Sequence, residues 1–139
     1  MPVVVNEDLI ARLHQQALAA QRRSYSPYSH FPVGAAIYTD RGRIITGTNV
    51  ENASFGLTIC AERGAIMRLV AEDAGAPLIC VVVGPHPNPL TPCGACRQVL
   101  LEFNKGMRVI AFGSRGARAD FDLGQLLPAS FSTDDLNQG

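Results

Sequence analysis

The sequence has no excess of charge of either sign and few aromatic residues. Lys plus Arg and Asp plus Glu both number 12, so the formal net charge is zero, and no basic run is present that could neutralise a row of phosphates. Aromatic residues make up 6% of the chain and tryptophan is absent, which is little for a groove that stacks the bases of a single strand. These shortages argue against a nucleic acid as the partner.

Long apolar runs are also missing. No segment approaches the roughly 20 apolar residues that are needed to span a bilayer. Met1 to Leu9 lacks the apolar stretch behind a positive start that marks an export signal. We therefore expect a cytoplasmic protein that does not contact a membrane. In that compartment a Cys-x-x-Cys pair is more often a metal or redox site than part of a disulfide framework.

The chain is long and apolar enough for one core. With 139 residues and 47% hydrophobic content, it falls in the range where a single domain buries most of its apolar surface. Because no internal repeat, low-complexity tract or linker divides it, we expect one domain over residues 1–139.

The hydrophobic pattern predicts a mixed α/β fold. Asn6 can cap a helix over 7–23, with Arg22 and Arg23 in its last turn. A loop rich in Ser, Tyr and Pro follows over 24–32, and then a hairpin of strands. Two helix and strand units come next, which implies a mixed sheet with helices on its faces. The expected strands are 33–39, 43–49, 78–83 and 108–112, and the two later helices are 60–74 and 93–103.

Three cysteines lie at the starts of the two later helices. Cys93 and Cys96 are three residues apart, so their sulfurs project from one helix face. Cys60 begins the other helix, and parallel strands are expected to bring both helix starts to one edge of the sheet. Three protein ligands leave the fourth position of zinc to water, which is typical of a catalytic site. Glu62, two residues after Cys60, can reach that water and move its protons.

The charge of such a site must be offset. Three thiolates on a divalent ion form a net negative cluster, which disfavours ionisation of bound water. The positive ends of two helix dipoles and a hydrogen bond from Arg63 to a thiolate can draw this charge off.

Other interpretations of the cysteines start from the same spacing. Cys93 and Cys96 alone are also compatible with a redox pair or inert core thiols. The upstream Cys-x-Glu and Pro92 before the pair favour catalytic zinc. Cys80 lies in an apolar strand and is interpreted as a small buried hydrophobic residue. His86 is a much weaker candidate for a fourth ligand.

Several sequence blocks together resemble a known family. Cys60-Ala61-Glu62 followed by Pro92-Cys93-Gly94-Ala95-Cys96-Arg97-Gln98 is similar to the zinc signature of the nucleobase deaminases. Three further blocks extend the resemblance to the small, homotetrameric cytidine deaminases, from near the amino terminus to near the end. These blocks are Ser29 to Ala36, Asn49 to Ala53, and Leu126-Leu127-Pro128 with Phe131.

The resemblance implies a fold, a cofactor and a reaction. The fold is a three-layer α/β/α sandwich with a central mixed sheet of about five strands. One Zn²⁺ binds each subunit of a homotetramer with shared active sites. The reaction is hydrolytic deamination of cytidine and deoxycytidine to uridine and deoxyuridine with release of ammonia, as in pyrimidine salvage. In this chemistry zinc-bound hydroxide attacks C4, and Glu62 shuttles the protons.

The same resemblance assigns substrate contacts. Asn49 and Glu51 hold the sugar hydroxyls, Phe31 packs on the nucleoside, and the backbone of Ala61 meets the base carbonyl. Phe131 stacks on the base held by a neighbouring chain's zinc. An amide that donates and accepts suits a hydroxyl, as does a carboxylate that only accepts. Without the resemblance, Asn49 reads as a turn residue, Glu51 as a solvated charge and Phe31 as core.

Two residues depart from the usual family pattern. Phe55 stands where many relatives carry Tyr, and Gly64 stands where Thr is common. Gly64 weakens its helix by up to about 1 kcal/mol relative to a good helix former. Both departures concern subunit packing and stability more than activity.

Three rival functions share some of these features. A related deaminase of another aminopyrimidine nucleoside would use the same zinc core, although Asn49 and Glu51 favour ordinary ribose. A zinc-stabilised binding module would need a fourth protein ligand, and the presence of Glu62 beside Cys60 argues against it. A polynucleotide deaminase would need a basic groove and stacking aromatic residues.

Overall fold

The computed structural model describes residues 6–136 and contains one mixed sheet. Strand β1 is antiparallel to both β2 and β3, β3 and β4 are parallel, and β4 and β5 are antiparallel. Because β2 and β3 both oppose β1, these two strands run in the same direction. In the order β2-β1-β3-β4-β5, the strands are Ile44–Thr48, Gly34–Thr39, Pro77–Val83, Arg108–Phe112 and Arg118–Asp122.

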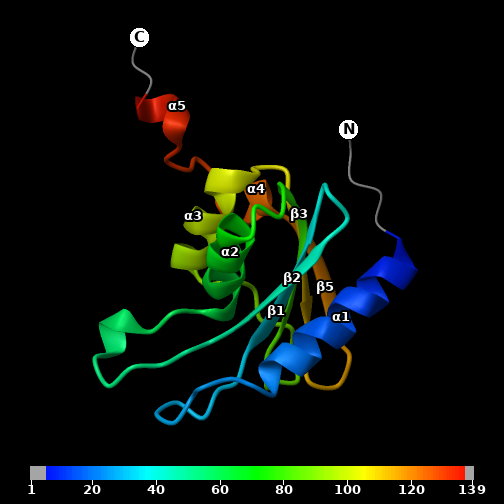
Figure 1. The fold of residues 1–139 in the computed structure, drawn as a ribbon, viewed down its shortest axis with the longest axis vertical. Helices are drawn as coiled ribbons and strands as arrows, with labels where there is room; N and C mark the ends of the chain where they lie inside the picture. Colours follow the sequence, from blue (N-terminus) through cyan, green and yellow to red (C-terminus); the bar gives the residue numbers. More distant parts are fainter. Residues whose placement is uncertain (1–5, 137–139) are drawn as a thin grey trace.

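Helices cover both faces of the sheet (Figure 1). Helix α1, Glu7–Gln21, packs on one face, and α2, Ala61–Ala71, and α3, Gly94–Phe103, pack on the other. Strand β3 is buried on both faces, as its continuous apolar run predicts. Its residues Ile79, Val81 and Val83 face α1, while Cys80 faces α2 and α3. The expected three-layer α/β/α sandwich with five strands is confirmed.

Helix α1 begins where the sequence predicts and ends earlier. The Asn6 side chain accepts hydrogen bonds from the backbone N–H groups of Asp8 at 2.8 Å and Leu9 at 3.3 Å. The predicted end at residue 23 is wrong, because the helix ends at Gln21. The following chain is drawn away from the helix, since the N–H of Tyr25 donates to the carbonyl of Asn49 at 3.1 Å.

The two later helices are also slightly shorter than predicted. Cys60 and Cys93 are the N-cap residues of α2 and α3 and stand just before the first helical turn. The predicted end of α2 at residue 74 is wrong, because Asp73 has a φ of +49° that no helix continues.

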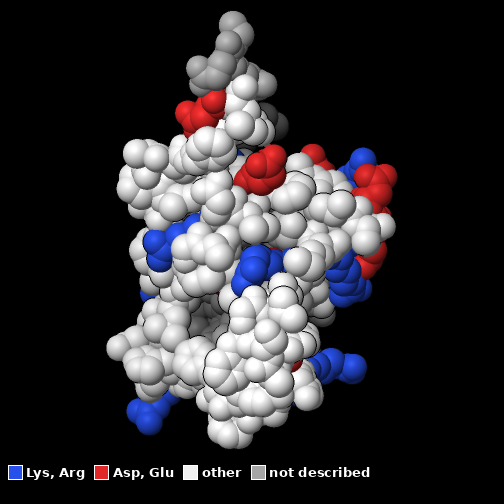
Figure 2. Space-filling view, turned by 90° about the vertical axis from the view of Figure 1, so that its left-hand side faces the viewer, with Lys and Arg blue, Asp and Glu red and all other residues white. Residues whose placement is uncertain are grey.

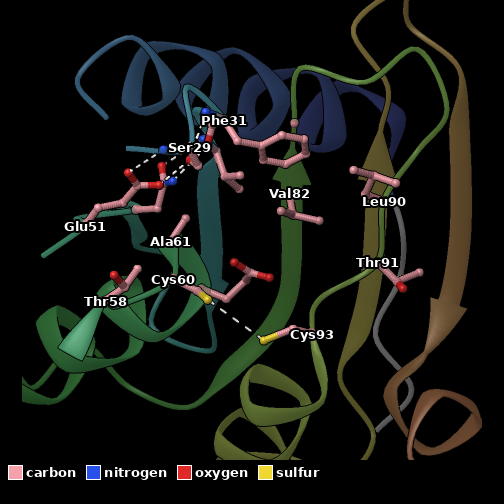
Figure 3. Close-up of a pocket in the computed structure, with 14 residues that line it drawn as sticks. Ser29, Phe31, Glu51, Thr58, Cys60, Ala61, Val82, Leu90, Thr91 and Cys93 are labelled. Carbon is pink, nitrogen blue, oxygen red and sulfur yellow. Dashed lines mark hydrogen bonds between the residues drawn. The ribbon is translucent and has the colours of Figure 1, made fainter. Parts of the chain in front are cut away.

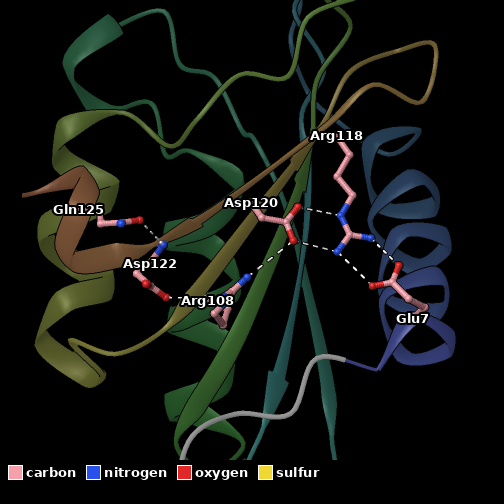
Figure 4. Close-up of polar contacts among 6 residues, drawn as sticks. All are labelled: Glu7, Arg108, Arg118, Asp120, Asp122 and Gln125. Atoms are coloured by element: carbon pink, nitrogen blue, oxygen red, sulfur yellow. Dashed lines mark hydrogen bonds and ion pairs between the residues drawn. The ribbon is translucent and has the colours of Figure 1, made fainter.

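Strand β5 was not predicted. It is an edge strand in which three charged residues, Arg118, Asp120 and Asp122, alternate with Ala119 and Phe121. The segment therefore has no apolar run that would indicate a strand. These charges find partners in the structure (Figure 4). Arg118 lies 2.6 Å from Glu7 and 2.7 Å from Asp120, which links β5 to α1. The short helices Phe55–Leu57, Leu123–Leu126 (α4) and Thr133–Leu136 (α5) were not predicted either.

Within residues 6–136, no helix is both long enough and apolar enough to cross a membrane.

Candidate active site

The sheet brings the starts of α2 and α3 together. Helix α2 follows β2 and α3 follows β3, and these strands run in the same direction, so both helices start at the same edge. Cys60 and Cys93 cap the two helices, and Cys96 lies in the first turn of α3. The predicted convergence of three cysteines on one point is therefore present in the fold.

The three sulfur atoms are spaced for one metal ion. The Sγ atom of Cys93 lies 3.9 Å from that of Cys60 and 3.5 Å from that of Cys96, and all three atoms lie within 4.8 Å of one another. Sulfurs bound tetrahedrally to zinc at about 2.3 Å would lie about 3.8 Å apart. The donor set and its spacing fit Zn²⁺ with three protein ligands.

Gly47 on β2, which has no side chain, lets the start of α2 pack close to the sheet. A Cβ atom on Gly47 would lie 2.3 Å from the carbonyl oxygen of Ala61 and 2.5 Å from the backbone nitrogen of Ala65. Any other residue at this position would push the start of α2 away from the sheet. Gly47 thus helps to set the height of Cys60, Ala61 and Glu62 above the sheet.

Positive groups surround the sulfurs. Arg63 donates from Nη2 to the Cys60 sulfur at 3.5 Å, and the amino-terminal ends of both helices point toward the cluster. Hydrogen bonds from Cys96 and then from Arg63 lower the pKa of the Cys60 thiol to about 5. The pKa of Cys96 is raised, because this buried thiol retains the proton that it shares with Cys60. Thiolate forms first at Cys60, where Arg63 stabilises it.

Glu62 is a buried carboxyl group beside the sulfurs. It is 4% exposed and occupies the first turn of α2. Burial raises the pKa of Glu62 to about 7, and the negative charge of Cys60 adds to this effect. A carboxyl group with a pKa near neutrality can both accept and release a proton.

A pocket of about 360 Å³ opens over these groups (Figure 3). This volume is within the range of about 300 to 1,000 Å³ that is typical of small-molecule sites. The pocket brings together seven residues that the sequence predicts for the site. These are Phe31, Asn49, Glu51, Cys60, Ala61, Glu62 and Cys93.

Phe131 is not among the residues that line this pocket. Its side chain is 59% exposed, and its carbonyl oxygen accepts a hydrogen bond from Gln98 at 2.8 Å. It lies just before α5, which projects from the body of the molecule in Figure 1. In one chain, therefore, Phe131 and the pocket are separate.

The pocket also contains residues that the sequence did not single out. Leu90 and Thr91 come just before the Pro-Cys-x-x-Cys block, and Ser29 comes two residues before Phe31. Ser29 belongs to a block that carries the family resemblance, and Leu90 and Thr91 are signalled by their closeness to the Cys-x-x-Cys pair. The unpredicted lining residues are Ser29, Val33, Thr58, Val82, Gly84, Leu90 and Thr91.

The Asn49 side chain is largely occupied by the protein. Its Oδ1 accepts from the N–H of Val33 at 2.9 Å and from the Ser24 hydroxyl at 2.5 Å. Its Nδ2 donates to the carbonyl of Phe31 at 2.8 Å. Since the amide oxygen has two lone pairs and the nitrogen two hydrogens, one N–H donor is left for a ligand.

Glu51 is held by the loop between α1 and β1. Its Oε1 accepts from the N–H groups of Tyr28 at 3.0 Å and Ser29 at 3.1 Å, and its Oε2 accepts from the Ser29 hydroxyl. The Ser29 hydroxyl in particular holds the pKa of Glu51 below its ordinary value. A carboxylate has about four lone-pair directions, so one acceptor is left for a ligand.

A three-layer fold with three cysteine sulfurs at two helix starts, beside a buried glutamate, defines the class of the zinc-dependent deaminases. Residues 8–113 match the family described as the cytidine and deoxycytidylate deaminase zinc-binding region. The chain belongs to this family, and the predicted resemblance is confirmed.

Individual relatives support this assignment over most of the chain. The chain is 45% identical over 124 residues to cytidine deaminase from Mycobacterium tuberculosis, covering 89% of this chain and 90% of the relative. It is 39% identical over 126 residues to cytidine deaminase from Halalkalibacterium halodurans, covering 90% and 96%. The crystal structure of cytidine deaminase from Burkholderia pseudomallei superposes with a TM-score of 0.84 at 41% identity, covering 87% of this chain and 98% of that one.

Proposed function

We propose that this protein deaminates cytidine and deoxycytidine by hydrolysis and releases ammonia. The observation that carries the proposal is the composition of one pocket. A three-sulfur metal site and a buried carboxyl group lie in the same cavity as Asn49 and Glu51, the two residues suited to a sugar. The cavity thus offers a reaction centre and a sugar site together.

The reaction centre rests on four residues. Cys60, Cys93 and Cys96 hold zinc, which supplies Lewis-acid activation of the attacking water. Glu62 accepts one proton from that water and passes it to the ring nitrogen N3. It then takes the remaining proton from the new hydroxyl group on C4 and gives it to the amino group, which leaves as ammonia while the C4 carbonyl forms. Burial keeps the Glu62 carboxyl group away from bulk water, so these protons pass between enzyme and substrate.

The sugar site requires a ligand group that can both accept and donate a hydrogen bond. Asn49 has one N–H left to donate, and Glu51 has one lone pair left to accept. A hydroxyl group satisfies both requirements, and the ribose and deoxyribose rings carry such groups.

The charge of the pocket favours a nucleoside over a nucleotide. Its lining includes the carboxylates of Glu51 and Glu62 and no Lys or Arg among the described residues. A phosphate on the sugar would meet repulsion without a matching cation. Figure 2 shows a hollow whose surroundings are mostly uncharged. The basic side chains on this face lie apart from one another. This pattern suits a small neutral ligand better than a polynucleotide.

The base fits the apolar part of the pocket. The side chains of Phe31 and Leu90 both approach Gly84, since a Cβ atom on Gly84 would lie 4.0 Å from Phe31 and 3.9 Å from Leu90. Phe31 is thereby placed to pack on the nucleoside. The N–H of Ala61 lies in the first turn of α2, where amides have no partner within the helix, and it can donate to the base carbonyl.

We extend the proposal to a cytoplasmic homotetramer, acting in pyrimidine salvage, with active sites shared between subunits. Large apolar side chains are exposed on the loops beside the pocket, including Tyr25, Phe55 and Leu57, and on the tail at Phe131. Such exposure is typical of surfaces that another subunit covers. In the tetramer Phe131 stacks on the base held by a neighbouring chain.

The experiment is an ultraviolet assay of zinc-loaded protein with cytidine, deoxycytidine, free cytosine and deoxycytidylate. We expect rapid turnover of the two nucleosides and little turnover of the base and the nucleotide. Faster turnover of deoxycytidylate would contradict the sugar site described above. Turnover confined to other aminopyrimidine nucleosides would instead favour the rival deaminase.

A further inference from the structure

Ser29 is a polar residue in the pocket with no role in the chemistry described above. It lies in the loop between α1 and β1, and its hydroxyl is the donor in one hydrogen bond and the acceptor in another. The hydroxyl donates to Oε2 of Glu51 and accepts from the N–H of Phe31 at 3.1 Å. It therefore joins the two residues that are proposed to contact the nucleoside from different sides (Figure 3).

Glu51 depends on this loop for its orientation. It follows β2 and lies, partly exposed, at the edge of the pocket. A glutamate side chain in contact with water loses considerable rotamer freedom when it is fixed for binding. Ser29 supplies two of the three donors that fix it, through its N–H at 3.1 Å and its hydroxyl, and Tyr28 supplies the third at 3.0 Å.

The backbone of the loop is shaped around the same hydroxyl. His30, between Ser29 and Phe31, has a φ of +55°, which is uncommon for a residue with a side chain. Its N–H donates to the carbonyl of Ser26 at 3.0 Å. The left-handed residue reverses the chain, so that the N–H of Phe31 returns to Ser29 and the Phe31 ring enters the pocket.

We propose that Ser29 is a positioning residue for nucleoside binding. Its hydroxyl aligns the free acceptor of Glu51 toward the sugar and ties the Phe31 loop to that carboxylate. It touches none of the reacting atoms, so it acts on substrate affinity and leaves the chemical step alone. The inference rests on the proposed function for the identity of the ligand.

The first test compares single variants of the zinc-loaded protein. We expect Ser29→Ala to raise the KM for cytidine and the Kd for uridine about tenfold, the value of one hydrogen bond to a charged group. We expect kcat to stay within about twofold, because the lost interaction stabilises the bound substrate and the transition state equally. Ser29→Thr keeps the hydroxyl and should restore both constants. The matched control is Ser114→Ala, which removes an exposed hydroxyl from the turn between β4 and β5, outside the pocket lining.

The second test asks whether Ser29 acts through Glu51. In a Glu51→Ala background there is no carboxylate to align, so most of the effect of Ser29→Ala should disappear. Equal effects in both backgrounds would overturn the proposal, as would a fall in kcat with KM unchanged or an equal rise in KM for Ser114→Ala. A wild-type protein that does not turn over cytidine would refute the proposed function instead, and this is measured first.

Discussion

The role proposed for Glu62 depends on its spacing from Cys60 in the sequence and on its burial in the tertiary fold. Its position two residues after Cys60 places a carboxyl group beside a metal ligand, which is visible in the sequence. Its burial to 4% exposure depends on the pocket walls, which come from the loop before β1, the end of β3 and the loop before α3. The residue type and spacing were therefore predictable, whereas the rise of its pKa to about 7 was not.

Replacement of Glu62 by Ala separates proton transfer from metal binding. We expect kcat/KM for cytidine to fall by about a hundred- to ten-thousand-fold, the usual contribution of general acid and base catalysis. Zinc content by elemental analysis should stay at one ion per chain, because Glu62 is not proposed as a ligand. Glu102→Ala, which removes an exposed carboxylate from α3, is the control and should leave both quantities unchanged. Loss of zinc from Glu62→Ala would make Glu62 a ligand.

At the scale of elements, two glycines on neighbouring segments have opposite consequences. A Cβ on Gly47 of β2 would overlap the backbone of α2 at 2.3 Å, whereas a Cβ on Gly64 of α2 would meet only the carbonyl oxygen of Thr48, at 3.6 Å. The first glycine is required by close packing. The second merely weakens the helix, as predicted from its position inside the helical segment.

We expect Gly47→Ala to lower the free energy of unfolding by about 2 kcal/mol or more, the usual cost of overpacking. It should also lower zinc content, since α2 carries Cys60. Gly64→Ala should raise the free energy of unfolding by about 0.5 to 1 kcal/mol, because alanine favours the helix. Urea unfolding of the two variants at equal protein concentration measures both effects. Similar stability for the two would show that α2 does not depend on its close approach to β2.

On the scale of the whole molecule, the pocket of one chain is open and the tail aromatic is exposed. Phe131 is 59% exposed, and Phe55, which stands where many relatives carry Tyr, is 73% exposed. Phe55 contacts Tyr28 edge to face, with ring centroids 5.8 Å apart, so it joins two loops beside the pocket. These apolar surfaces are the part of the molecule that assembly would cover.

Coexpression of Phe131→Ala and Glu62→Ala chains tests whether sites are shared. If Phe131 acts on a neighbouring chain, mixed oligomers contain sites with an intact Glu62 from one chain and an intact Phe131 from another. Their activity should exceed the average of the two parent variants. Mass spectrometry of the intact oligomer establishes that mixing occurred. Activity no higher than the average in a mixed preparation would mean that each chain builds its own site.

The sequence by itself determined the layered fold, the family and the three cysteines that are proposed as metal ligands. The reason is that these features depend on short-range patterns. A three-residue spacing places Cys93 and Cys96 on one helix face, and continuous apolar residues predict that β3 is buried on both faces. The bounds of β4 were predicted at residues 108–112 because its apolar run is bordered by turn residues on both sides.

Only the tertiary structure decided the contacts between distant segments. Ser29 meets Glu51 across 22 residues of sequence, and Arg118 meets Glu7 across 111. Helix α1 ends at Gln21 because the next segment bonds to the chain after β2. Strand β5 is joined to α1 by the ion pair of Arg118 with Glu7, which the pattern of the strand does not predict. No local period encodes such contacts, since each depends on how the sheet arranges segments that are remote in the chain.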